Sequence, residues 1–134
     1  MRTKFVVLVA AAVLLASAGR VLAHHSFSAE FDANKPFKMT GTVTKVEWMN
    51  PHTFFYIDVT DEKTKKVTNW AMEMGSPNGL MRQGWTRNSM KAGDIVTVEG
   101  SLAKDGSPTG NARSVTLQKT GQRLFAASSQ GQTP

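Results

Sequence analysis

The sequence predicts a mostly β protein: a small five-stranded OB-like barrel with one short helix between strands three and four, preceded by a signal peptide. Short segments in which apolar and polar residues alternate follow one another from residue 37 to 126, separated by turn-forming residues. One segment with helical spacing interrupts this series after its third member. The length of 134 residues suits a single domain. The same strand count would also fit a small open β-sandwich or a lipocalin-like half barrel.

The first 23 residues have the features of a secretory signal peptide. Arg2 and Lys4 give a positive start, residues 5–18 form an apolar run, and Val21-Leu22-Ala23 forms a cleavage site. About 14 apolar residues are too few to cross a membrane, which needs about 20. We therefore expect cleavage after Ala23, with cleavage after Ala18 as the alternative. The expected mature form has no membrane span and is periplasmic or secreted.

The first strand is expected to follow an N-terminal arm over residues 24–36, which show no clear period. Along the strand, residues 37–48, the apolar positions up to Val43 share one face, whereas Trp48 falls on the other. A β-bulge near Thr44 and Lys45 would produce this slip and bend the strand.

The second and third strands, residues 53–60 and 67–74, are expected to form a hairpin around a charged turn. Strand two alternates regularly, so its two faces are easily separated. The expected core face carries Phe55, Ile57 and Val59. The opposite face carries Phe54, Tyr56 and Asp58.

A short helix is expected after Gly75. Ser76 is a good N-cap, Pro77 suits the first helical position, and Leu80 and Trp85 follow at helical spacing. Strands are then expected over residues 95–100 and 112–118, with a final edge strand over 122–126. The resulting layout is a signal peptide over 1–23, an N-terminal arm over 24–36, the OB-like β-barrel domain over 37–126 and a disordered tail over 127–134.

Composition argues against several functional classes. The chain has no cysteine, which excludes disulfides, thiolate metal sites and thiol nucleophiles. Of its 16 basic residues, Arg2, Lys4 and Arg20 lie in the expected signal peptide, which leaves 13 basic and 10 acidic residues, a net charge of +3. These basic residues are scattered, so no nucleic acid partner is expected. The common enzyme motifs are missing from the sequence, and we do not expect an enzyme.

Six motifs distributed along the mature chain carry a family resemblance. They are His24-His25-Ser26-Phe27, Glu30-Phe31-Asp32, Gly41-Thr42-Val43 to Trp48, Asn50-Pro51-His52, Gly75-Ser76-Pro77-Asn78 and Lys91-Ala92-Gly93-Asp94. Together they resemble a domain-of-unknown-function family of short exported proteobacterial proteins. The resemblance implies export and an OB-like β fold, and it brings no established activity with it.

The three histidines of the chain are the sharpest chemical signal. Cleavage after Ala23 would make His24 the amino terminus, where the α-amine and Nδ1 together can chelate a metal. His52, after strand one, could then complete a T-shaped copper(II) site, because nitrogen ligands in tetragonal geometry suit Cu(II). His25 could serve instead, through its imidazole and its own deprotonated amide. The candidate metal ligands are therefore His24, His25 and His52, and the candidate cofactor is copper.

A simpler interpretation of the histidines stays open. The adjacent pair could form only a polar start of the mature chain, and His52 could only close a turn. Two histidines at one terminus and one in a loop do not form a zinc spacing motif.

Three aromatic residues on or beside the first two strands form a second candidate site: Trp48, Phe54 and Tyr56. OB domains bind oligomers by stacking planar groups on this part of the barrel. Core packing is the alternative role, since a small barrel needs large side chains. This hypothesis describes an OB-type ligand-binding or protein-interaction module without metal, whose partner is an unknown envelope protein or a small ligand.

Overall fold

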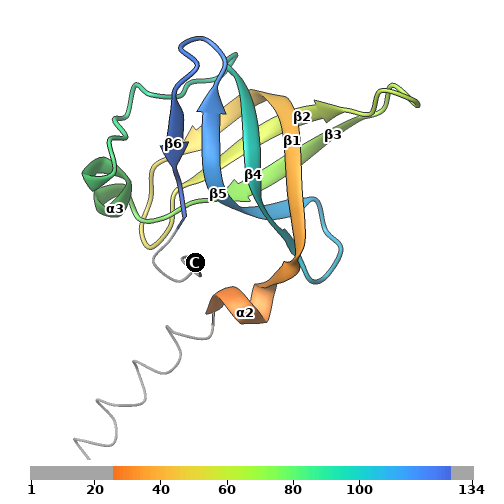
Figure 1. Ribbon diagram of the computed structural model, residues 1–134, viewed down its shortest axis with the longest axis horizontal. Coiled ribbons are helices and arrows are strands. Elements are labelled where there is room, and N and C mark those ends of the chain that lie inside the picture. The colour runs from red at the N-terminus through yellow and green to blue at the C-terminus, as the bar shows by residue number, and fades with distance from the viewer. Residues whose placement is uncertain (1–25, 128–134) are drawn as a thin grey trace, which may run out of the picture.

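The computed structural model describes residues 26–127 (Figure 1). This part of the chain is mostly β, with six strands and two short helices. In chain order the elements are α2 (Ser26–Glu30), β1 (Phe31–Glu47), β2 (Phe54–Thr60), β3 (Val67–Glu73), α3 (Pro77–Arg82), β4 (Ile95–Ala103), β5 (Thr109–Leu117) and β6 (Arg123–Phe125). Between residues 26 and 127, no helix is long and apolar enough to cross a membrane. The expected signal peptide, His24, His25 and residues 128–134 lie outside the described residues.

The strands form one sheet in the order β3-β2-β1-β4-β5-β6, in which neighbouring strands run antiparallel. A further pairing, between β3 and β5, is parallel and runs from Ala71 opposite Thr109 to Glu73 opposite Asn111. This pairing joins two strands that are far apart in the sheet order. It therefore closes β1 to β5 into a ring, and β6 extends the sheet beyond β5.

The long strand β1 contributes to two sides of the ring. At Thr42 it pairs with Ile95 of β4 and with Asp58 of β2, so its first part follows β4 and its last part follows β2. The register with β2 shifts between Val43 and Lys45. This confirms the predicted β-bulge, and a bulge at this point bends the strand as it changes partner.

The chain before Phe37 differs from the expected arm. Residues 26–30 form α2, and β1 already begins at Phe31, which pairs with Ala103 of β4 and is buried. The register with β4 shifts between Phe31 and Pro36, so this first part of the strand lacks a continuous alternation. That interruption explains why the sequence pattern gave no sign of a strand here.

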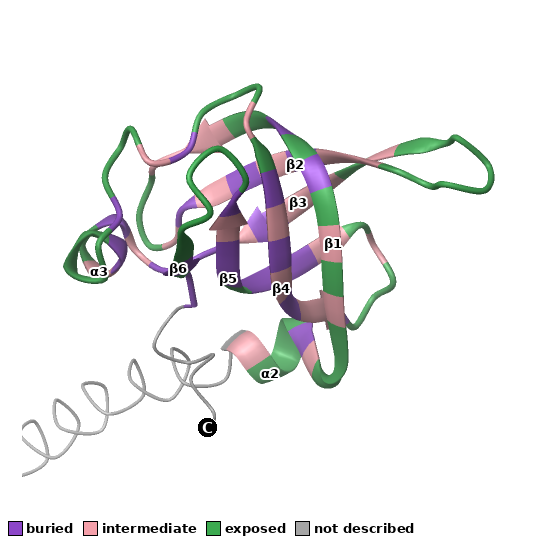
Figure 2. Ribbon diagram, turned by 45° about the horizontal axis from the view of Figure 1, so that its top comes forward, coloured by how far each residue is buried: buried purple, intermediate pink, exposed green. Residues whose placement is uncertain are grey.

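The apolar core fills the ring. Phe55 and Ile57 of β2 are fully buried, which confirms the predicted core face, and Val59 is half-buried at its end. Figure 2 shows how the buried residues continue along β4 and β5. The buried core residues are Val43, Phe55, Ile57, Met72, Met74, Leu80, Trp85, Met90, Val96, Val98, Ala112, Val115, Leu117, Leu124 and Ala126.

The helix α3 has the predicted cap. Ser76 Oγ accepts a hydrogen bond from the Gly79 amide at 3.1 Å, and proline occupies the first turn. The helix ends at Arg82, so Trp85 lies beyond it rather than on its face. Trp85 is buried, and its indole Nε1 donates to the Phe125 carbonyl at 2.8 Å, which fastens this connection to β6.

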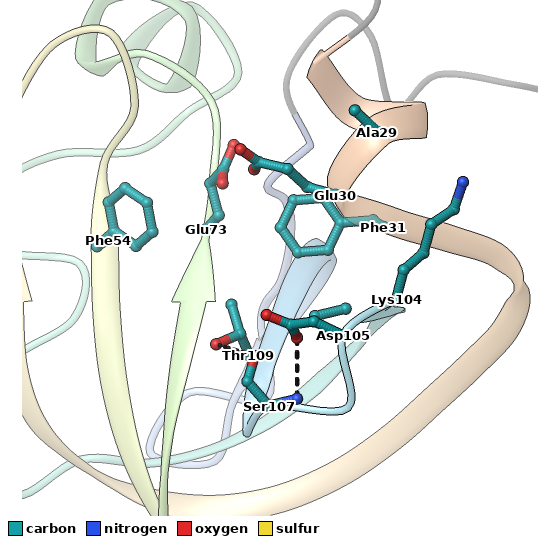
Figure 3. A pocket seen from close by; sticks show the side chains of 10 residues that line it. Ala29, Glu30, Phe31, Phe54, Glu73, Lys104, Asp105, Ser107 and Thr109 are labelled. Carbon is teal, nitrogen blue, oxygen red and sulfur yellow. Dashed lines mark hydrogen bonds between the residues drawn. The ribbon is translucent and has the colours of Figure 1, made fainter.

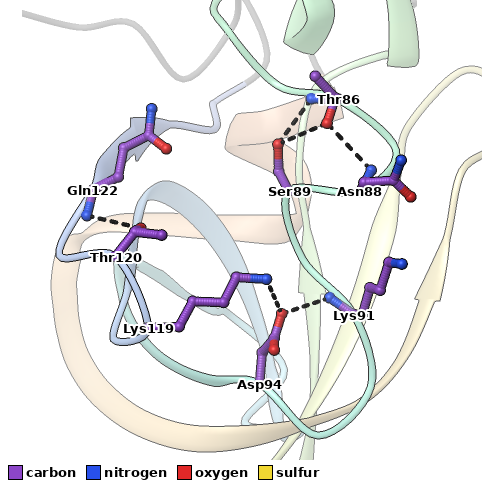
Figure 4. A network of polar contacts seen from close by, with 8 residues as sticks. All are labelled: Thr86, Asn88, Ser89, Lys91, Asp94, Lys119, Thr120 and Gln122. Atoms are coloured by element: carbon purple, nitrogen blue, oxygen red, sulfur yellow. Dashed lines mark hydrogen bonds and ion pairs between the residues drawn. The ribbon is translucent and has the colours of Figure 1, made fainter.

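Polar contacts close the loops near the start of β4 (Figure 4). The Asp94 carboxylate accepts hydrogen bonds at 2.8 Å from Lys119 Nζ and from the Lys91 amide. The bond from Lys119 is the main reason why the pKa of Asp94 lies below its usual range. These contacts join the loop before β4 to the turn after β5.

Candidate functional site

A cavity of about 550 Å³ lies at the other end of the ring, between α2, the start of β2, the end of β3 and the β4–β5 loop (Figure 3). Phe54 lies opposite Glu73 in the β2–β3 pair, and the parallel pairing of β3 with β5 brings the β4–β5 loop beside them. The residues that line it are Ala29, Glu30, Phe31, Phe54, Glu73, Ala103, Lys104, Asp105, Ser107 and Thr109.

Helix α2 is held against this cavity by the loop that follows β4. The Lys104 amide donates to the Glu30 carbonyl at 2.8 Å, and Lys104 Nζ donates to the Ser28 carbonyl. The rings of Phe27 and Phe31 lie 5.7 Å apart between centroids. These contacts place Glu30, the last residue of the helix, on the cavity wall.

Glu73 is the unusual carboxylate of this site. Its side chain is only 13% exposed, and Figure 3 shows its carboxylate and that of Glu30 pointing toward one another. The pKa of Glu73 is raised, first because burial disfavours the charged form; a positive charge on His52 opposes the rise, and the negative charge of Glu30 adds to it. Acid groups with a raised pKa in a cavity are candidates for a functional role.

The other carboxylates whose pKa is shifted in the described part of the chain behave in the opposite way. Each has a lowered pKa because hydrogen bonds from neighbouring groups favour its charged form. They are Glu47, Asp61, Asp94, Glu99 and Asp105.

His52 is held next to Glu73 by the backbone. Its Nδ1 lies 3.0 Å from the Met74 carbonyl oxygen and 3.5 Å from Glu73 Oε1. Since a carbonyl can only accept, this contact assigns the proton to Nδ1 and leaves Nε2 unprotonated in the neutral ring. Two backbone hydrogen bonds of Thr53, to Gly75 at 3.0 Å and from Met74 at 2.8 Å, fix the segment.

The predicted metal ligands are therefore only partly placed. His52 lies beside Glu73, whereas His24 and His25 are outside the described residues. Among residues 26–127, no group of three or more histidine, cysteine, aspartate or glutamate side chains could hold a metal ion.

The three aromatic residues of the second candidate site do not share one surface. Phe54 lines the cavity. The Tyr56 hydroxyl instead donates to Glu47 Oε2 at 3.4 Å. Trp48 is half-buried against the core, and the Arg87 guanidinium lies 5.8 Å from the centroid of its ring. Only Phe54 is thus available to a ligand in the cavity.

Neither Glu30 nor Glu73 was a candidate site residue in the sequence. Glu73 alternates with the buried residues Met72 and Met74 along β3, a pattern that predicts a solvent-exposed outward side chain. Glu30 belongs to a segment without clear periodicity. A local pattern cannot reveal a pair formed by residues that are 43 positions apart.

Comparison with known proteins places the chain in a family. No curated protein matches it. The model of a family of unknown function, DUF6152, matches residues 11–113, which is more than half of the chain and includes Glu30, His52 and Glu73. This match agrees with the resemblance found in the sequence motifs. The chain belongs to the DUF6152 family, a family of unknown function.

Proposed function

We propose that the chain is an exported binding protein that holds Cu(II) between its mature amino terminus and His52. The observation that carries this proposal is the orientation of His52. Its Nδ1 donates to the Met74 carbonyl, so Nε2 is the ring nitrogen available to a metal. Histidines that bind metals are commonly oriented in this way, by a hydrogen bond from the second ring nitrogen to a carbonyl or carboxylate.

The position of α2 supports the same proposal. His24 and His25 directly precede Ser26, and consecutive Cα atoms are about 3.8 Å apart, so the chain keeps both histidines close to the start of α2. The helix has five residues, spans about 6 Å and ends at the cavity with Glu30. Export with cleavage after Ala23 supplies a free α-amine. The amine, the imidazole of His24 and the imidazole of His52 form a nitrogen set that suits Cu(II), with His25 as the alternative ligand.

The ring of strands is, in this proposal, an OB-type barrel. The order β1-β2-β3-β5-β4, closed by the pairing of β4 with β1, and the helix between β3 and β4 support this assignment. OB folds bind ligands on the face of strands two and three and on the loops after strands one and four. The cavity is lined from β2, β3 and the β4–β5 loop, and His52 belongs to the loop after β1, so the candidate site occupies this binding region.

A second function is favoured by the cavity itself. Its volume of about 550 Å³ lies within the range of about 300–1,000 Å³ that small-molecule sites occupy, and Phe54 and Phe31 give it apolar walls. In this alternative the protein binds an organic ligand or a segment of an envelope protein without any metal.

Electron paramagnetic resonance of the mature protein with one equivalent of Cu(II) tests the first function. Intact mass first verifies that the purified chain begins at His24. We expect a type-2 spectrum with nitrogen hyperfine structure that changes in both His24→Ala and His52→Ala. A chain extended by one glycine before His24 is the matched control, because it keeps every side chain but removes the free amine of His24. An identical spectrum in all four proteins would exclude the proposed copper site.

A further inference from the structure

The cavity beside α2 has a charge pattern that neither the copper proposal nor its ligands explain. Glu30 and Glu73 come from α2 and β3, and their carboxylates point toward one another (Figure 3). Asp105 on the same wall adds a third negative charge, its carboxylate held by the Ser107 amide at 2.9 Å. Two like charges in a partly desolvated cavity repel one another more strongly than in water. The cavity is therefore electrostatically complementary to a cation.

Lys104 makes no ion pair with these two carboxylates, and His52 makes only a long contact with one of them. Lys104 is the basic residue of the lining, and its ammonium donates to the Ser28 carbonyl and points away from the carboxylates in Figure 3. His52 reaches Glu73 at 3.5 Å, but its proton is directed to the nearer Met74 carbonyl at 3.0 Å. The side chain of Glu73 is thus only 13% exposed. Among residues 26–127, its ion-pair partner is His52, at this long distance.

The remaining walls are apolar and aromatic. Phe54 lies beside Glu73 across the β2–β3 pair, and Phe31 is buried next to Glu30. Aromatic faces attract organic ammonium and guanidinium groups, because the face of the ring carries partial negative charge. Residues 26–127 contain no group of acidic and histidine side chains able to hold a metal ion, so an organic cation fits this lining better than an inorganic one.

We propose that the cavity binds an organic cation, with its ammonium or guanidinium group between Glu30 and Glu73 and its apolar part against Phe54 and Phe31. This proposal names a ligand class for the metal-free function described above and rests on that function, not on the copper site. Glu73 is the principal anionic partner, because it is the more buried of the two carboxylates and is already desolvated.

Calorimetric titration of the mature protein in the presence of a chelator tests this proposal. The probes are phenethylamine, which is cationic at neutral pH, and 2-phenylethanol, its neutral counterpart. We expect saturable binding of the amine alone, weakened about tenfold or more by Glu73→Gln, because a hydrogen bond between two charged groups is lost. Glu47→Gln is the matched control, since Glu47 lies across from Phe54 on β1 but outside the cavity lining.

The outcomes distinguish failure of the cation assignment from failure of the cavity as a ligand site. Equal binding of both probes, lost in Phe54→Ala, would keep the cavity as a ligand site but overturn the assignment of a cation. Binding of the amine that is unchanged in Glu73→Gln would overturn the role of Glu73. If neither probe binds, the proposal is overturned, including the role that it gives to the aromatic side chains. Binding of the amine by a His24→Ala variant would show that amine binding does not depend on the proposed copper site.

Discussion

The two faces of β2 carry different parts of the molecule. Phe55 and Ile57 point into the ring and are fully buried, whereas Phe54 and Tyr56 point outward and are half-buried. The inward residues belong to the core, and Phe54 on the outward face lines the candidate site. One strand of seven residues can serve both purposes because successive side chains point to opposite faces of a sheet. Substitutions on its two faces should therefore separate stability from binding.

The largest effect is expected from the two adjacent phenylalanines. Phe55→Ala should lower the free energy of unfolding by about 3–5 kcal/mol, because it leaves a cavity in the core. Phe54→Ala should lower it by less than about 2 kcal/mol, because that ring is only partly buried. Urea denaturation of both variants without ligand measures the difference. Equal losses would mean that the two faces of β2 contribute alike to the fold.

A smaller effect is expected at the polar start of the inward face. Thr53 is fully buried, and its Oγ1 has no hydrogen-bond partner among residues 26–127. Thr53→Val keeps the shape of the side chain and removes the unsatisfied hydroxyl, so it should raise the free energy of unfolding by about 1 kcal/mol. Thr53→Ala, which removes the methyl group's packing as well, should not stabilise the protein. A less stable valine variant would show that the hydroxyl has a partner.

The pH dependence of stability should distinguish Glu73, whose pKa is raised, from the carboxylates whose pKa is lowered. The pKa of Glu73 is raised by burial, so the folded protein holds this proton more tightly than the unfolded chain. The stabilisation of the folded state by this tighter proton binding is complete at pH values below the pKa of glutamate in the unfolded chain. It is lost as the pH rises through the pKa of Glu73 in the folded protein. Glu73→Gln should therefore gain stability relative to the wild type as the pH rises above about 4.3.

Asp94 provides the opposite sign for comparison. Its pKa is lowered by Lys119, so its contribution to stability is present above the unfolded pKa and is lost as the pH falls. Asp94→Asn should thus lose stability relative to the wild type at neutral pH but not under strongly acidic conditions. Parallel pH curves for the Glu73 and Asp94 variants would contradict the assigned environments.

The smallest effect is expected at Tyr56. Its hydroxyl makes one long hydrogen bond, at 3.4 Å to Glu47, and both residues are only half-buried. Tyr56→Phe should change the free energy of unfolding by less than about 0.5 kcal/mol, as surface substitutions commonly do. It should also leave binding of phenethylamine unchanged, since Tyr56 is not part of the cavity lining. A clear loss of amine binding would extend the site further along β2.

Local sequence patterns predicted much of the fold. Alternation identified the inward face of β2, a change of parity located the bulge between Val43 and Lys45, and Ser76 with Pro77 marked the start of α3. These features depend on neighbouring residues, so a single sequence contains them. The start of β1 was missed because its register with β4 shifts between Phe31 and Pro36.

The site was predicted only in part for a related reason. His52 and Phe54 stood out through residue type and position, but no local pattern singled out Glu73 or connected these residues with Glu30. Trp48 and Tyr56 looked equivalent to Phe54 in the sequence and are placed elsewhere in the structure. A local pattern states which face of a strand a residue occupies, not which distant element covers that face.

The sequence by itself determined most of the strands and the inward face of β2, because backbone geometry repeats every two residues in a strand and every 3.6 in a helix. Only the tertiary structure decided that β3 pairs with β5 and that α2 packs beside the loop after β4. Those contacts join segments far apart in the chain and depend on the register of the whole sheet. The packing of α2 brings Glu30 to Glu73, whereas the backbone hydrogen bonds of Thr53 at the end of the β2–β3 hairpin place His52 beside Glu73.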